Sequence, residues 1–125
     1  MKSNSNERPQ IIQDLGNGSY YYNAQITPTT STDPDGQERA GFDYNSILFW
    51  GKPERAKIVK AVIRDEMDES REFDLVNSYN AAKAGLIEDE DAADAAEAAY
   101  LAHLRRVQEI KTQVKADLAA AGYND

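Results

Sequence analysis

The segment from Glu88 to Ala121 is a continuous stretch of helix-forming residues, and it constrains the fold more than any other part of the chain. It contains neither proline nor glycine, and Gly122 follows it where a helix would end. At ~1.5 Å per residue, such a helix would be on the order of 45 Å long. A compact domain of this size has a radius of gyration of about 14 Å. The sequence therefore predicts one long Ala-rich helix over residues 88–122 that pairs, projects or folds back.

Composition places the chain near the limit for folded domains. Leu, Ile, Val and Phe together number 23 of the 125 residues, and the formal net charge is -8. Seven tyrosines and one tryptophan partly make up for the missing aliphatic side chains. We expect one folded domain with a thin core, and such domains often gain stability by associating with a partner.

Several classes of protein are disfavoured by what the sequence lacks. The chain has no cysteine, which excludes disulfides and thiolate metal sites. The polar start MKSNSNERPQ predicts no signal peptide, and no run approaches the ~18 apolar residues of a membrane span. Direct nucleic-acid binding requires a basic surface, so the acidic balance argues against it. We expect no membrane association and no direct nucleic-acid contact.

The first half of the chain predicts a three-stranded antiparallel meander. After a flexible tail over residues 1–9, apolar and tyrosine-rich runs flank Gly16-Asn17-Gly18 and predict a β-hairpin over 10–27. The polar segment 28–40 predicts a loop, because it contains a Pro-Asp-Gly turn. Residues 41–50 predict the third strand.

The end of this third strand, Ile47–Trp50, is apolar at every position, so we expect it to be covered on both faces. Two short helices are predicted next, over 53–67 and 70–84, the first carrying an apolar stripe that includes Ile58 and Val62. The expected fold is therefore α+β, with a core over residues 10–87 followed by the long helix.

Residues that could carry catalysis are few. The single histidine, His103, falls in the middle of the long helix, where a surface or seam position accounts for it better than a catalytic base. Residues 31–42 superficially resemble a calcium loop, but Ser31 and Phe42 occupy positions that require acids. Carboxylates cluster over Asp65–Asp74, where helix capping explains them more simply than acid–base or metal chemistry. We predict a non-enzymatic protein without catalytic residues, metal or cofactor, and an enzyme using divalent metal near Asp68 is the less favoured alternative.

Two groups of residues are candidates for a protein interface. Three consecutive tyrosines cannot all face one side of a strand, so at least one of them must face away from the core. The long helix carries an apolar seam at 3–4 spacing that could pair with another helix. The predicted interface residues are Tyr20, Tyr21, Tyr22, Tyr100, Leu104, Val107, Val114 and Leu118.

This chain resembles a group of small proteins encoded by bacteriophages and prophages of gut bacteria. The resemblance is carried by the order of the runs IIQDLGNGSYYYNAQI, ILFWGKPERAKIVKAVIRDE and EFDLVNSYNAAK. The similarity covers most of residues 10–120, and the Ala-rich stretch Asp91–Ala99 departs from the pattern. The resemblance implies a phage particle or its assembly, such as a tail component. It assigns no catalytic residue.

The leading hypothesis is therefore a non-enzymatic phage structural or assembly protein that self-associates and docks on a larger phage protein. Its location would be the virion, or the host bacterial cytoplasm during assembly. The alternative is an acidic regulator or inhibitor that binds a basic host protein through Asp65–Asp74 and Glu88–Asp91.

Overall fold

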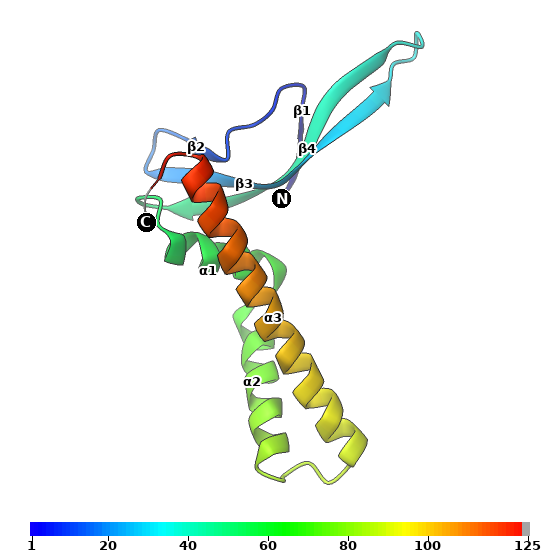
Figure 1. The fold of residues 1–125 in the computed structure, drawn as a ribbon, viewed down its shortest axis with the longest axis vertical. Helices are drawn as coiled ribbons and strands as arrows, with labels where there is room; N and C mark the ends of the chain where they lie inside the picture. The colour runs from blue at the N-terminus through cyan, green and yellow to red at the C-terminus, as the bar shows by residue number, and fades with distance from the viewer. Residues whose placement is uncertain (124–125) are drawn as a thin grey trace. The chain divides into compact units, whose positions relative to one another are not determined.

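Four strands precede three helices along the chain, and the computed structural model describes residues 1–123 (Figure 1). The strands are β1 (Lys2–Ser5), β2 (Ile12–Asp14), β3 (Ser19–Thr32) and β4 (Glu38–Trp50). The helices are α1 (Arg55–Glu66), α2 (Glu69–Lys83) and α3 (Glu90–Ala120). The predicted α+β class is confirmed, and the predicted helix bounds differ from these by one or two residues.

The described chain divides into two compact units. The first, called here the sheet unit, contains Met1–Ala61 and the described residues from Val114 onward. The second, called the helical unit, is Val62–Gln113. Helices α1 and α3 each contribute residues to both units.

The sheet has the order β1-β4-β3-β2, and each neighbouring pair is antiparallel. The long β3–β4 pair runs from Ser19 opposite Trp50 to Thr32 opposite Glu38. Its register is irregular between Ala24 and Thr27. Beyond that point the two strands continue as a ribbon that extends past β1 and β2 (Figure 1).

Three predictions about this sheet are wrong in detail. The sheet has four strands instead of three, because part of the predicted tail over residues 1–9 forms β1 and pairs with residues 42–45 of β4. The predicted loop over 28–40 is mostly strand, and only the turn around Gly36 separates β3 from β4. The stretch is polar because both faces of the ribbon meet solvent, while its threonines favour extended backbone.

One face of the sheet supplies the core of the sheet unit. Residues opposite each other in antiparallel strands share a face, so Tyr20 and Tyr22 lie with Phe49 and Ile47. The buried apolar side chains of this unit are Ile12, Tyr22, Ala24, Ile47 and Phe49 from the sheet, Ile58 and Val59 from α1, and Val114 and Leu118 from α3. The Tyr22 hydroxyl donates a hydrogen bond to Asp117, and burial together with this bond raises the pKa of Tyr22. The last turns of α3 are thereby attached to this face.

The opposite face holds a buried polar cluster beneath the N-terminal segment. The Asn23 amide donates to the Gln10 carbonyl at 2.8 Å and to Gln13 Oε1 at 3.2 Å. Ser46 Oγ donates to Asn23 Oδ1 at 2.8 Å and lies 3.2 Å from Ser3 Oγ. These bonds satisfy the buried side chains and hold the N-terminal segment on the sheet.

In the helical unit, α2 and the adjoining part of α3 form an antiparallel pair. The rings of Tyr79 and Tyr100 lie 4.6 Å apart, and Lys83 Nζ lies 3.5 Å from Glu97 Oε1. Residue numbers therefore rise along one helix as they fall along the other. Within this unit the long helix folds back along α2, which is one of the alternatives that the sequence leaves open.

Core membership of Leu118 can be tested by shortening its side chain. Leu118 is 2% exposed, so Leu118→Ala should lower the free energy of unfolding by about 2–5 kcal/mol through lost burial and a cavity. The matched change Leu101→Ala, at a side chain that is 45% exposed, should cost less than about 1 kcal/mol. Urea denaturation followed by circular dichroism measures both, and equal losses would contradict the burial of Leu118.

Candidate interaction surfaces

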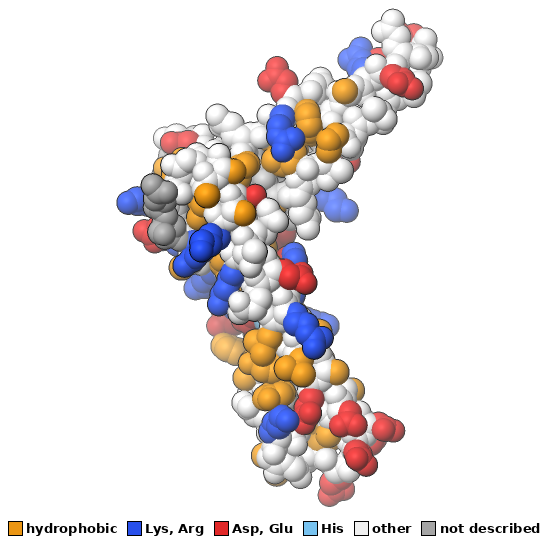
Figure 2. All heavy atoms as spheres, viewed as in Figure 1, with side chains coloured by type: hydrophobic (Ala, Val, Ile, Leu, Met, Phe, Trp, Pro, Cys, Tyr) orange, Lys and Arg blue, Asp and Glu red, His pale blue; other side chains and the backbone are white. Residues whose placement is uncertain are grey.

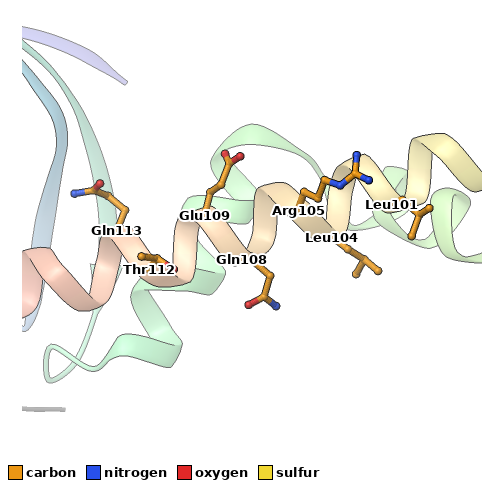
Figure 3. Close-up of a pocket in the computed structure, with 7 residues that line it drawn as sticks. All are labelled: Leu101, Leu104, Arg105, Gln108, Glu109, Thr112 and Gln113. Atoms are coloured by element: carbon orange, nitrogen blue, oxygen red, sulfur yellow. The ribbon is translucent and has the colours of Figure 1, made fainter.

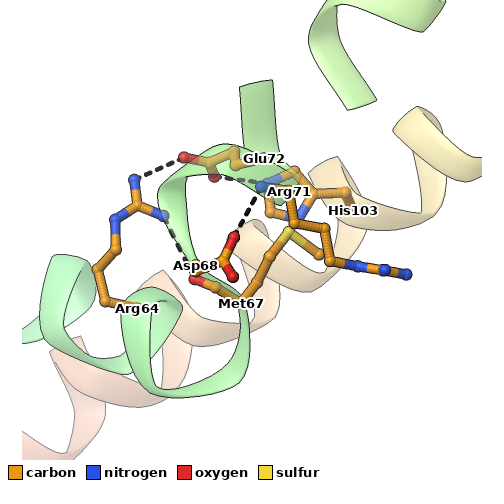
Figure 4. A network of polar contacts seen from close by, with 6 residues as sticks. All are labelled: Arg64, Met67, Asp68, Arg71, Glu72 and His103. Atoms are coloured by element: carbon orange, nitrogen blue, oxygen red, sulfur yellow. Dashed lines mark hydrogen bonds and ion pairs between the residues drawn. The ribbon is translucent and has the colours of Figure 1, made fainter. Parts of the chain in front are cut away.

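A polar contact joins three helical segments within the helical unit. Glu72 of α2 lies 2.7 Å from the Arg64 guanidinium through Oε1 and 2.7 Å from His103 Nε2 through Oε2 (Figure 4). Arg64 belongs to the last turn of α1 and His103 to α3. His103 thus lies in the seam between helices, and both Glu72 oxygens have partners.

This contact also affects the charge of Glu72. The hydrogen bond from Arg64, with a smaller contribution from His103, holds the pKa of Glu72 below its ordinary value despite partial burial. Glu72 is therefore stabilised as the carboxylate on which both neighbours converge. The contact therefore holds three helical segments together, and both oxygens of the Glu72 carboxylate already have a hydrogen-bond partner.

The other acids of Asp65–Asp74 include helix caps and ion-pair partners. Asp68 caps α2 by accepting a 2.8 Å hydrogen bond from the Arg71 amide. Glu66 pairs with Arg106 through hydrogen bonds of 2.7 and 2.8 Å. Among residues 1–123, no three His, Cys, Asp or Glu side chains converge as a potential metal-binding group.

The predicted interface on α3 is only partly exposed. Val114 and Leu118 are 1% and 2% exposed in the sheet unit, so the prediction that they offer a free contact surface is wrong. Tyr100 and Val107 are half-buried in the helical unit. Leu104 is 39% exposed, because His103 occupies the seam position next to it.

The three tyrosines divide between the two faces of the sheet. Tyr22 is buried, and Tyr20 stacks on Phe49 with ring centroids 5.4 Å apart, so both serve the core. Tyr21 lies on the opposite face, directly across from Leu48. Of the three predicted contacts on the hairpin, Tyr21 alone points away from the core.

Leu48 and Trp50 make this opposite face apolar, and sequence reasoning missed it. Leu48 lies directly opposite Tyr21, and Trp50 lies two residues further along β4, so both are on the same face as Tyr21. The two side chains are 47% and 62% exposed. The expectation that both faces of Ile47–Trp50 are covered is therefore wrong for the outer one. Strict alternation from the buried Ile47 and Phe49 would have identified these outward positions. We call Tyr21, Leu48 and Trp50 the open face.

A second exposed apolar region lies on the helical unit. Because α2 and α3 are antiparallel and Glu72 meets His103, the next residues, Phe73 and Leu104, turn to the same side. Both are exposed. Leu101 and Leu104 also border a shallow hollow along α3, with Gln108 pointing to the same side as Leu104 (Figure 3). Acidic side chains gather near the α2–α3 connection on the face shown in Figure 2.

No protein-family model matches the chain, and no curated protein or solved structure matches it. No helix within the described residues is both long and apolar enough to cross a lipid bilayer. The chemistry of the surfaces is therefore the basis on which a function can be proposed.

The Glu72 contact predicts a dependence of stability on pH. A carboxyl whose folded-state pKa is lowered stabilises the fold above its ordinary pKa of 4.5, and this contribution is lost as pH falls through the lowered value. Glu72→Gln should therefore cost about 1 kcal/mol at neutral pH, and the difference should shrink in acid. Thermal unfolding at several pH values measures it, with exposed Asp74→Asn of the same helix as the control. If the loss of stability caused by Glu72→Gln were the same at every acidic pH, the lowered pKa of Glu72 would be contradicted.

Proposed function

We propose that this chain is a non-enzymatic assembly protein that associates with itself and docks on a larger protein partner. The observation that carries the proposal is the open face, where Trp50 is 62% exposed beside Leu48 and Tyr21. Single exposed apolar residues are common on protein surfaces, whereas adjacent ones usually mark a binding site.

The residue types of the open face favour a protein partner. Tryptophan and tyrosine are enriched at interfaces, where they combine a large apolar area with a polar group at the rim. The strands also hold Trp50 and Leu48 on a paired backbone, since Trp50 lies opposite Ser19 and Leu48 opposite Tyr21. A rigid anchor loses little conformational freedom on binding, which is typical of residues that dominate interface energy.

The setting we propose is a bacteriophage particle or its assembly. Support comes from the resemblance to small phage and prophage proteins over most of residues 10–120. The partner would then be a phage structural protein, and the location the virion or the host cytoplasm during assembly. A non-enzymatic role is supported by Glu72 and His103, whose contacts connect helices.

An acidic regulator of a basic host protein is the second candidate, and the charge of the helical unit favours it. Residues 62–113 include thirteen Asp and Glu but only six Lys and Arg. Such a surface would attract a basic partner, and salt would weaken the attraction by screening. Binding that persists at high salt would favour the open face instead.

Self-association is tested by light scattering over a wide concentration range, with Trp50 emission recorded in parallel. We expect the mass to rise above 13.9 kDa with concentration, and the emission of the single tryptophan to shift to the blue as its indole leaves water. Leu48→Asp should raise the concentration needed for association at least about tenfold, because a buried charge costs more than 1.4 kcal/mol.

The matched control is Ala99→Asp, which introduces the same charge at an exposed apolar residue of α3 that does not line the hollow. It should leave association and Trp50 emission unchanged. A monomeric mass at every concentration would contradict self-association and favour the acidic-regulator function.

A further inference from the structure

The connection between α2 and α3 presents an apolar side chain among acids. Gly85 ends α2 with φ 74°, and the Leu86 amide donates to the Ala81 carbonyl at 2.9 Å, closing a Schellman turn. This turn fixes the backbone of Leu86 while its side chain remains 76% exposed. Four consecutive acids, Glu88–Asp91, follow it, and all are exposed. We call Leu86 and Glu88–Asp91 the acidic tip.

The open face has the opposite charge at its border. Lys52 follows Trp50 by two residues and is exposed. Lys57 is also exposed, and its Nζ would lie 2.7 Å from a Cβ placed on Gly51, so the ammonium group lies beside the end of β4. Two exposed lysines thus lie beside the end of β4, where Trp50 is exposed.

We infer that the acidic tip of one copy docks on the open face of a second copy. Leu86 would contact Trp50 and Leu48, and the carboxylates of Glu88–Asp91 would meet Lys52 and Lys57. Apolar surface then covers apolar surface, and opposite charges meet at the rim, as in complementary interfaces. This inference rests on the proposed self-association and names the surfaces that produce it.

Charge also disfavours the two symmetric alternatives at these surfaces. Joining two open faces would bring the lysines of both copies into one interface. Joining two tips would place Glu88–Asp91 against its own copy. Juxtaposed like charges cost free energy, so the contact of tip with face is favoured.

A contact between two different surfaces can form in two ways. In a two-fold symmetric dimer each tip docks on the face of the other copy, whereas a single contact leaves one tip and one face free and continues to larger assemblies or a ring. The mass measured by light scattering distinguishes the two, because only the second gives masses above that of a dimer.

The test uses two full-length charge-reversal variants. Lys52→Glu with Lys57→Glu makes the face variant. Glu88→Lys, Glu90→Lys and Asp91→Lys together make the tip variant, whose four residues then carry a net charge of +2, because Asp89 is kept to accept the amides of Asp91 and Ala92. Each alone should remain monomeric where the natural chain associates, because its tip and face now repel. An equimolar mixture should associate again, with a blue shift of Trp50 emission, since each tip then meets a face of opposite charge.

Controls separate this contact from folding and from general charge effects. Circular dichroism checks that each variant keeps its helices, and Leu86→Ser weakens the contact without changing charge. Lys111→Glu reverses an exposed charge elsewhere on α3, outside the hollow, and should leave association unchanged.

The outcomes also distinguish this inference from the proposed function. If both variants associate alone as the natural chain does, or if mixing restores nothing, the contact of tip with face is wrong. Self-association through the open face would then still stand, provided that Leu48→Asp weakens it. A single-stranded oligonucleotide that shifts Trp50 emission, with no restoration on mixing, would assign the open face to nucleic acid instead.

Discussion

The need to bury one stripe of α3 organises both units of this protein. Near the C-terminal end of the helix, Val114 and Leu118 are buried in the sheet unit, where the Asp117 carboxylate accepts the hydrogen bond from Tyr22. Further back, Tyr100 and His103 contact α2 in the helical unit. Residues of α3 at this 3–4 spacing thus pack against an apolar sheet face in one unit and against polar and aromatic side chains of α2 in the other.

The sequence was sufficient for the helices because their signals are local. An uninterrupted run without proline, and glycines where helices end, determine α2 and α3 regardless of distant contacts. Strand extent depends on partners that are distant in sequence. The polar residues Lys2–Ser5 form a strand because residues 42–45 of β4 offer an edge to pair with, which no local pattern reveals.

The surfaces were harder to predict than the elements, because periodicity identifies a stripe and not what covers it. The apolar spacing predicts Leu104 in the seam, yet His103 lies there, where Glu72 is its hydrogen-bond partner. Likewise, Leu118 looks like an interface residue until the sheet that covers it is known. A polar residue can thus outcompete an apolar neighbour for a buried position when its partner is already in place.

The two units also differ in how charged and apolar side chains are distributed between them. Residues 62–113 hold thirteen of the chain's 22 acids, while Trp50, its single tryptophan, is in the sheet unit with lysines beside it. The carboxylates of the helix pair are exposed to water, and so are the apolar side chains of the open face. Under the proposed self-association, the acidic surface of one copy would cover the apolar surface of the next, so the two features are explained by one contact.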